Sequence, residues 1–455
     1  MVNIKENFEI IKSENTWWSN SIYESKKFRR EMFDNLIKDS DNSHSILVTG
    51  PRRIGKTIIL NQLVEYFIKN KISKENILFI NLDDFRLTIS NTKDLYEILV
   101  FFSTKIAKDG KKIIIIDEIQ HIKDWQGLLK TYFDSIPDFK FYISGSSSNI
   151  SYMKNSSKLV GRLHKYDLLP MSYREFSQFS SKDIKSDKID FFKKNKKDIF
   201  EFANSLILNS NKSIFDNYFL KGGYINFINI EDIKILRKNI EDVLDLTINK
   251  DIVENFNVRN TSKFFDILRL LSKSICNPQS AYNISKTISL NSETIEDYLF
   301  FLESVFLISH LEIYSSSAKG KIRSPNKYYF KDSALLNYFN NALDKEFYLQ
   351  NNYLGKVAEN LVFNHLDNYS KENNIQLGYF QYKDNREIDF VLYTQFNILP
   401  IEIKYETNIS NKELEAINDF IKDNNAKFGI VITKDKLELE GKILFIPLEY
   451  FLMFF

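Results

Sequence analysis

A stretch near the amino end, SILVTGPRRIGKTIILNQLVEYFIKN, constrains the fold of this chain more than any other. It reads as an apolar strand, a glycine-containing loop and an amphipathic helix. The loop, G-P-R-R-I-G-K-T, matches the pattern G-x-x-x-x-G-K-[ST] of loops that hold nucleotide phosphates. The strand before it and the helix after it set it apart from a chance match. The stretch therefore predicts an α/β P-loop NTPase core that binds ATP with Mg2+.

Each position of this loop has a physical role. Gly50 and Gly55 let the backbone pass close to phosphates, whose charge is met by amide N–H groups and a helix N-terminus. Lys56 is expected to reach the β- and γ-phosphates, and Thr57 to bind Mg2+. The residues expected to contact the nucleotide here are Gly50, Pro51, Arg52, Arg53, Ile54, Gly55, Lys56, Thr57 and Ile58.

Two further apolar strands carry polar residues at their carboxyl ends, where α/β sheets bind ligands. KKIIIIDEIQ runs through four isoleucines into Asp117 and Glu118. Asp117 is predicted either to bind Mg2+ directly or to contact a ligand that binds the ion. Glu118 is predicted to act as the base that orients the attacking water. The strand in FKFYISGSSSNI ends in Ser144, which either senses the γ-phosphate or only closes a buried strand.

Length and composition limit the number of domains, the kinds of partner and the cellular location that we expect. The chain has 455 residues, more than one hydrophobic core usually serves, and its net charge of +2 leaves nucleic-acid contact to local patches. The single cysteine, Cys276, excludes an internal disulfide, and the amino terminus lacks a signal-peptide pattern. Its longest apolar runs fall short of the roughly 20 residues of a spanning helix. We therefore expect a cytoplasmic protein with no membrane span.

Several motifs together resemble a known family. ILVTGPRRIGKT, NLDD, IIIIDEIQ, YISGSSS and VGRLHKYDLLPMSYREF resemble the AAA/STAND-like ATPases of archaea and bacteria that end in a restriction-endonuclease-like, PD-(D/E)xK domain. The resemblance covers most of the chain and is weakest in its lysine-rich middle. It implies that Arg162 reaches the nucleotide phosphates or couples the ATPase core to the rest of the chain. The alternative for Arg162 is a surface or salt-bridge residue.

The middle of the chain predicts a linker, helices and a winged-helix-like module. The stretch 177–200 is rich in Ser, Lys and Asp and reads as a solvated connection. In the module, the second helix carries Glu293, Glu296, Asp297 and Glu303 and no Lys or Arg, so DNA phosphates would repel it. The basic residues lie in a predicted wing, at Lys319, Lys321, Arg323 and Lys327. We expect a protein-contact module, with DNA contact through the wing as the alternative.

From residue 352 the predicted order is helix, three strands, helix and strand, which resembles the restriction-endonuclease-like core. The family signature, a carboxylate on one strand and E-x-K on the next, falls on Asp389, Glu402 and Lys404, and its helix glutamate on Glu359. The predicted domains are therefore a P-loop ATPase domain (1–176), a linker and helical lid (177–270), a winged-helix-like domain (271–345) and a nuclease-like αβββαβ domain (346–455).

Strand geometry predicts how the two carboxylates meet. Alternation puts Asp389 on the opposite face from Ile388 and Phe390. A hairpin with its loop centred after Gln395 pairs Asp389 directly with Glu402. A shift of one residue would place an apolar residue, Ile388 or Phe390, opposite Glu402 and mix apolar with charged residues on both faces. The pattern of residues therefore favours this register.

Two like charges directly opposite each other destabilise a sheet, so something must offset them. A Mg2+ ion bridging Asp389 and Glu402 would do so, and Lys404 on the same face would then stabilise developing charge or position water. The resemblance implies Glu359 as a further ligand of this ion. The alternative is a structural network with Lys404 and Glu387 at a strand edge, in which the charge of the pair is neutralised without metal. The first alternative predicts an ATP-regulated nuclease in DNA processing or defence. The second predicts a non-cleaving nucleotide-driven switch that binds DNA, a protein or a second copy of itself.

Overall fold

The computed structural model describes residues 4–19, 23–135, 138–145, 161–181, 187–253, 256, 258, 260–315, 324–344 and 353–455. The chain divides into two compact units, which are described separately. The first comprises Met1–Leu169 and Asn249–Asn257, and the second Pro170–Ile248 and Val258–Phe455. Among the described residues, no helix combines the length and the apolar character needed to cross a membrane.

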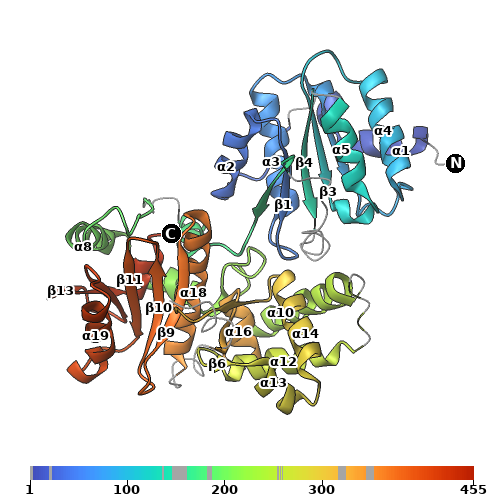
Figure 1. The fold of residues 1–455 in the computed structure, drawn as a ribbon. Helices are drawn as coiled ribbons and strands as arrows, with labels where there is room; N and C mark the ends of the chain where they lie inside the picture. The colour runs from blue at the N-terminus through green and yellow to red at the C-terminus, as the bar shows by residue number, and fades with distance from the viewer. Residues whose placement is uncertain are drawn as a thin grey trace. The chain divides into compact units, whose positions relative to one another are not determined.

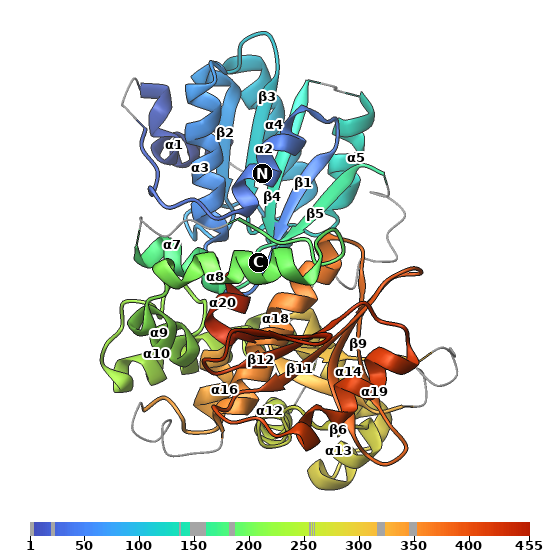
Figure 2. The same cartoon turned by 90° about the vertical axis from the view of Figure 1, so that its left-hand side faces the viewer.

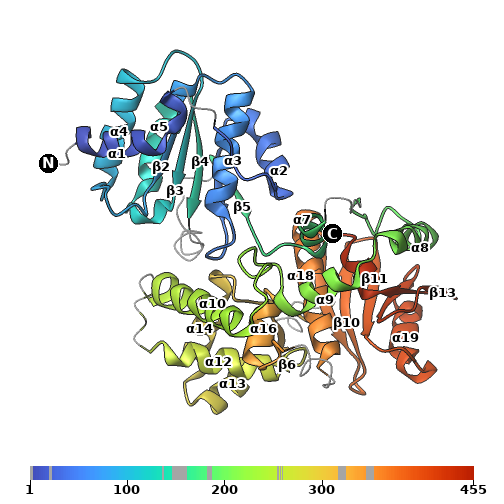
Figure 3. The same ribbon diagram turned by 180° about the vertical axis from the view of Figure 1, so that it is seen from behind.

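The first unit is built on a five-stranded parallel sheet in the order β2-β3-β4-β1-β5. The strands are β1 (Ser45–Thr49), β2 (Ile77–Asn81), β3 (Lys112–Asp117), β4 (Phe139–Gly145) and β5 (Leu163–Asp167). The helices are α1 (Ile4–Glu14), α2 (Met32–Lys38), α3 (Lys56–Lys69), α4 (Thr92–Lys105) and α5 (Trp125–Ser135). Figures 1 and 3 show α2 and α3 on one face of the sheet, and α1, α4 and α5 on the other.

Helices on both faces explain why the central strands are apolar along their whole length. The four isoleucines of β3 are fully buried, and those at 114 and 116 pack in one core with α1, α4 and α5. The predicted α/β class of this part is confirmed. Because all five strands are parallel, their carboxyl ends meet at one edge, and the loop after β1 lies there.

The second unit begins with helices. They are α7 (Tyr173–Ser180), α8 (Lys196–Ser205), α9 (Lys212–Lys221), α10 (Ile233–Leu246), α12 (Ser262–Lys273), α13 (Ala281–Ile288), α14 (Ser292–Ser304) and α16 (Ser333–Phe339). Three antiparallel strands in the order β6-β8-β7 accompany them: β6 (Pro278–Gln279), β7 (Ile308–Leu311) and β8 (Asn326–Phe330). A π-helix, Thr247–Val253, follows α10 and carries the chain into the first unit.

The expected solvated linker at 177–200 is partly wrong. Phe191 is buried, and its ring lies 5.3 Å from that of Tyr369 and 5.8 Å from that of Phe451. The backbone N–H of Ile189 donates to the carbonyl of Phe454 at 3.0 Å. The lysines dominated the composition of this stretch and concealed three buried apolar residues, Ile189, Phe191 and Ile199.

The C-terminal part of the second unit contains a six-stranded sheet in the order β13-β14-β12-β11-β10-β9. Its strands are β9 (Gln376–Gln381), β10 (Glu387–Tyr393), β11 (Ile398–Lys404), β12 (Gly429–Thr433), β13 (Glu438–Glu440) and β14 (Ile443–Pro447). The helices are α18 (Leu354–Glu372), α19 (Glu415–Asp423) and α20 (Leu448–Leu452). In Figures 1 and 2, α18 and α19 lie on opposite faces of this sheet. The predicted order from α18 to β12 is confirmed.

The predicted hairpin register is also confirmed, since Phe390 pairs with Ile401. The strict alternation is wrong, however. Pairing of β10 with β9 shifts by one residue between Ile388 and Val391, which is a β-bulge. Ile388 and Val391 therefore pack together against α19, while the ring of Phe390 lies 6.3 Å from that of Phe363 on α18.

Both edges of this sheet are protected. At one edge, β9 is covered by the chain that follows β7, because the N–H of Tyr379 donates to the carbonyl of Glu312 at 3.0 Å. The approach is close: a Cβ atom at Gly378 would lie 3.0 Å from the backbone nitrogen of Tyr314. At the other edge, β13 has three residues, and its Glu438 and Glu440 both pair with Lys436.

Candidate functional site

The loop between β1 and α3 has the shape of a phosphate cradle. Gly50 has φ +153°, and a Cβ atom there would lie 2.2 Å from the carbonyl oxygen of Leu168, so only glycine fits. Gly55, with φ +106°, turns the chain into α3. The Nζ atom of Lys56 donates to the carbonyls of Gly50 and Pro51 at 3.1 and 3.0 Å. The lysine that should meet the phosphates therefore lies folded over their cradle.

The other loop residues predicted to contact ATP frame this cradle. Ile54 is buried, whereas Ile58 is half-buried on the first turn of α3. Arg53 has φ 60°, in the left-handed region. We therefore expect phosphate oxygens to be bound by the backbone N–H groups of the loop more than by these side chains.

The predicted metal and base residues meet beside this loop. The hydroxyl of Thr57 donates to one oxygen of Asp117 at 2.5 Å, and Ser144 donates to the other. Burial raises the pKa of Asp117, and the hydrogen bonds from Ser144 and Thr57 work against that rise. A hydroxyl and a carboxylate are the protein ligands that Mg2+ takes beside nucleotide phosphates, so this pair fits the ion.

Glu118 follows Asp117 in a left-handed conformation, with φ 57°. Its backbone N–H donates to the hydroxyl of Ser144 at 3.0 Å, and Gln120 donates to its carboxylate. Ser144 thus holds Asp117 and the backbone of Glu118 in place.

An unpredicted carboxylate, Asp251, lies against the loop. Arg52 donates to both of its oxygens, from Nε at 2.9 Å and from Nη2 at 2.8 Å. Asp251 is only 4% exposed; burial raises its pKa, and the charge of Arg52 opposes that rise. The charges of Lys56 and Glu118 also act on Asp251. No sequence signal pointed to it, because Asp251 lies in a short polar stretch that matches no motif.

Arg162 does not lie at this edge of the sheet. It directly precedes β5, and its carbonyl accepts from the N–H of Ser45, the first residue of β1. The phosphate loop follows the other end of β1, roughly 15 Å away by strand rise. Arg162 pairs instead with Asp134 at 2.9 Å. The prediction that Arg162 reaches the phosphates is wrong, and its salt-bridge alternative is confirmed.

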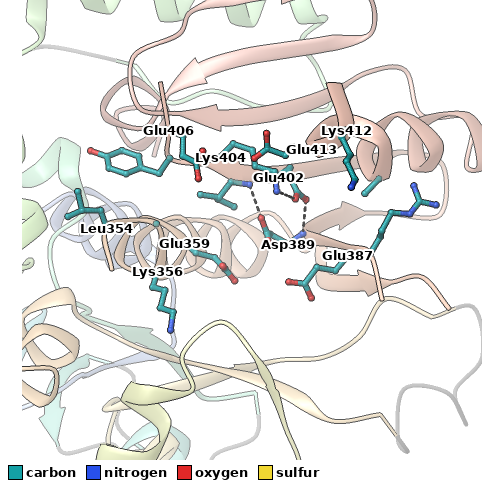
Figure 4. Close-up of a pocket in the computed structure, with 15 residues that line it drawn as sticks. Leu354, Lys356, Glu359, Glu387, Asp389, Glu402, Lys404, Glu406, Lys412 and Glu413 are labelled. Carbon is teal, nitrogen blue, oxygen red and sulfur yellow. Dashed lines mark hydrogen bonds and ion pairs between the residues drawn. The ribbon is translucent and has the colours of Figure 1, made fainter. Parts of the chain in front are cut away.

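A second candidate site lies in the C-terminal part of the second unit, in a pocket of about 740 Å³. Figure 4 shows Asp389 and Glu402 on neighbouring strands, with Glu359 and Glu387 directed toward the same space. Lys404 also lines the pocket. The structure therefore brings together all four of the residues predicted to form a cleavage site.

The two facing carboxylates are held by each other's strands. The N–H of Asp389 donates to Glu402 at 3.3 Å, and the N–H of Ile403 donates to Asp389 at 2.8 Å. Lys404 donates to the other oxygen of Glu402 at 2.8 Å. Burial and the charge of Asp389 raise the pKa of Glu402 to about 8, although Lys404 opposes this. Protonation of Glu402 therefore relieves part of the predicted repulsion.

Lys327 supplies the other positive charge. It is fully buried, and its Nζ lies 3.4 Å from Glu359, 3.2 Å from Glu387 and 3.8 Å from Asp389. Burial works against its charge, but these carboxylates more than offset that effect and raise its pKa. Its assignment to a basic wing is wrong. The other predicted wing residues, at 319, 321 and 323, lie outside the described residues.

These contacts affect whether the carboxylates of the pocket are available to bind the expected Mg2+ ion. The oxygens of Asp389 and Glu402 that face the strands already accept hydrogen bonds, and Glu359 accepts from Tyr329 at 2.6 Å. Burial raises the pKa of Glu359 to about 7. Across the described part of the chain, no three Asp, Glu, His or Cys side chains are grouped to hold a metal ion. Hydrogen bonds and the charge of Lys327 thus already act on carboxylates that a divalent cation would need.

Comparisons with known proteins agree with the first site. Residues 42–177 match the model of the AAA domain family, which supports a P-loop ATPase domain in this part of the chain. Two domains of unknown function match elsewhere, DUF8612 over residues 212–346 and DUF4143 over residues 354–451.

Relatives extend along most of the chain. An uncharacterized protein of Methanocaldococcus jannaschii is 29% identical over 403 residues, covering 86% of this chain and 82% of its own. An uncharacterized protein of Haemophilus influenzae is 24% identical over 422 residues, covering 91% and 95%. Among solved structures, the Orc1 protein of Aeropyrum pernix in complex with DNA matches with a TM-score of 0.32 and 12% identity, covering 74% of this chain and 97% of its own. That score carries no argument about this chain.

Proposed function

We propose that this protein is an ATP-hydrolysing switch, in which the nucleotide bound at the P-loop controls the state of the C-terminal part of the chain. The cradle of Gly50 and Gly55 would bind the phosphates, with Lys56 released from its backbone contacts to meet them. Thr57 and Asp117 would hold the Mg2+ that arrives with ATP, and Glu118 would orient the attacking water.

The observation that best supports this proposal is the contact between Arg52 and Asp251. Asp251 belongs to Asn249–Asn257, a segment of the first unit that the chain reaches from the second and then leaves again. ATP would bring negative charge beside Arg52 and Lys56, where it competes with the carboxylate of Asp251. Nucleotide binding and the position of this segment are therefore linked, and each must affect the other by the same free energy.

Replacing Asp251 with asparagine tests this linkage. Asp251→Asn keeps an oxygen for Arg52 but removes the competing charge, so we expect ATP to bind about 5-fold or more tightly. Calorimetric titration of ATP with Mg2+ in a Glu118→Gln background would measure the change without hydrolysis. The matched control is Asp245→Asn, an exposed aspartate of α10.

A second measurement follows the segment itself. In the parent protein, ATP should speed hydrogen exchange of the amides in 247–253, since it weakens the hold of Arg52 on Asp251. In Asp251→Asn this ATP effect should be lost. Equal ATP affinities for Asp251→Asn and Asp245→Asn, with no exchange response in the parent, would show that the pair is only structural.

A nuclease acting in DNA processing or defence is the second candidate function. It is supported by the order of elements from α18 to β12 and by the meeting of Asp389, Glu402, Lys404 and Glu359 in one pocket. The partners of Lys327 favour the non-cleaving switch instead, because that lysine already places one positive charge beside Glu359 and Asp389. In the switch, the C-terminal part would bind a protein or nucleic acid without cutting it.

Plasmid cleavage separates the two functions. We expect no Mg2+- or Mn2+-dependent nicking of supercoiled DNA by the purified protein, with or without ATP, above the level of Asp389→Asn. That variant is the right control because it removes one carboxylate of the pocket and leaves the P-loop intact. Metal-dependent nicking that disappears in Asp389→Asn would establish the nuclease and reject the non-cleaving switch.

A further inference from the structure

Lys327 does not itself line the pocket, but it contacts three of the carboxylates that do, and it comes from a different sheet. It lies on β8, where its backbone pairs with Leu311 of β7 and Pro278 of β6. Its side chain is 0% exposed, and its Nζ lies within 4 Å of Glu359 on α18 and of two residues of β10. The three-stranded sheet therefore contributes one ammonium group to the acidic side of another sheet.

The surroundings of this ammonium hold it in place. The ring of Tyr379 lies 5.4 Å from Nζ, and the hydroxyl of Tyr379 donates to the carbonyl of Pro325 at 2.6 Å. Tyr329, two residues along β8, donates its hydroxyl to Glu359. A buried lysine is costly unless it is paired and hydrogen-bonded, and here both conditions are met.

Lys327 and a divalent ion exclude each other at this position. Mg2+ binds oxygen ligands at about 2.1 Å in near-octahedral geometry. An ion bridging Asp389 and Glu359 at such distances would lie against the ammonium, which contacts both carboxylates. Two cations so close to each other repel strongly, because the ammonium of Lys327 is fully buried and water screens its charge poorly.

We propose that Lys327 is the resident cation of this carboxylate site, that it replaces a divalent metal there, and that it binds the β6-β8-β7 sheet to the C-terminal sheet. The inference rests on the non-cleaving form of the switch proposed above. It assigns to Lys327 a structural and charge-balancing role at a site where the sequence pattern alone predicts metal chemistry.

The test compares metal responses of melting temperature in a Lys56→Ala background without nucleotide, so that the P-loop binds no metal. The parent should show no shift with Mn2+ at millimolar concentration. Lys327→Met removes the charge but keeps most of the side-chain volume, and should melt roughly 5–10 °C lower in EDTA because buried carboxylates lose their partner. Mn2+ should restore several degrees by binding only the folded state.

Lys331→Met is the matched control. Lys331 is also buried and directly follows β8, but it pairs with Asp367 outside the pocket. Its replacement should lower the melting temperature with no restoration by Mn2+. Lys327→Arg, which keeps the charge, should likewise gain no Mn2+ response.

The parent protein alone can overturn the inference. A Mn2+ shift in the parent that is absent from Asp389→Asn would show that the site takes metal with Lys327 present, and this readout stands even if Lys327→Met does not fold. If the parent binds metal but leaves plasmid uncut, only the role of Lys327 is rejected. If it binds metal and cuts, the non-cleaving switch is rejected as well.

Discussion

Lys56→Ala is expected to lower ATP turnover by at least about 100-fold, the usual scale for removing a charge that stabilises a phosphoryl-transfer transition state. The physical reason is that the side chain of this first residue of α3 lies over the cradle between Gly50 and Gly55. Lys69→Ala, at the far end of the same helix and largely exposed, is the control and should keep full activity. Steady-state phosphate release measures both.

Glu118→Gln should separate binding from hydrolysis. The amide keeps the size of the carboxylate, so ATP should still bind, but it cannot act as the base that orients water. Calorimetric titration should therefore give an ATP affinity close to that of the parent protein, while phosphate release falls to the level of Lys56→Ala. Unchanged turnover in both variants would remove the assignment of an active ATPase.

Glu402→Gln is expected to raise stability at alkaline pH. The folded protein holds a proton on Glu402 up to about pH 8, whereas an unfolded glutamate releases it near its ordinary value of 4.5. The stability contributed by this protonation is full below pH 4.5 and is lost as pH rises toward 8. The glutamine side chain has no such proton to lose. The free energy of unfolding of the variant, relative to that of the parent, should therefore rise by a few kcal/mol (about 2–4) between pH 5 and pH 8.5.

Thermal denaturation across that pH range in EDTA provides the measurement. The control is Glu406→Gln, an exposed glutamate at the rim of the same pocket. A difference between Glu402→Gln and the parent that stays constant with pH would show that Glu402 is ionised in the folded protein. If Mg2+ removed the alkaline loss from the parent, the charge of Glu402 would be balanced by metal after all.

Local features of the sequence predicted much of this structure. The loop between β1 and α3 is set by neighbouring residues, so the positions of Gly50, Gly55 and Lys56 between a strand and a helix were predicted from the sequence. The hairpin of β10 and β11 was predicted with its register, because a period of two leaves one pairing that buries both apolar faces. The order of the C-terminal elements followed from the same kind of pattern.

Long-range partners were missed for a physical reason. Arg52 and Asp251 are 199 positions apart in the sequence. The residues around each of them do not predict that the two side chains make contact. Lys327 looked like a wing residue, because a lysine at the start of a short strand is ordinarily exposed. Its burial depends on Glu359, 32 positions away, and on carboxylates of β10. Strand alternation could not reveal the bulge after Ile388, which depends on pairing with β9.

The protected edges of the C-terminal sheet limit how this part of the molecule can bind a partner. Many proteins bind an extended peptide as an extra strand, which requires an open row of backbone donors and acceptors. On β9 the backbone N–H and carbonyl of Tyr379 are paired with residues 312–314, and β13 offers only three residues, two of them glutamates. A peptide cannot extend this sheet at β9 without displacing the protein's own chain. Any partner of this part of the chain is therefore expected to contact side chains of its helices, loops or pocket.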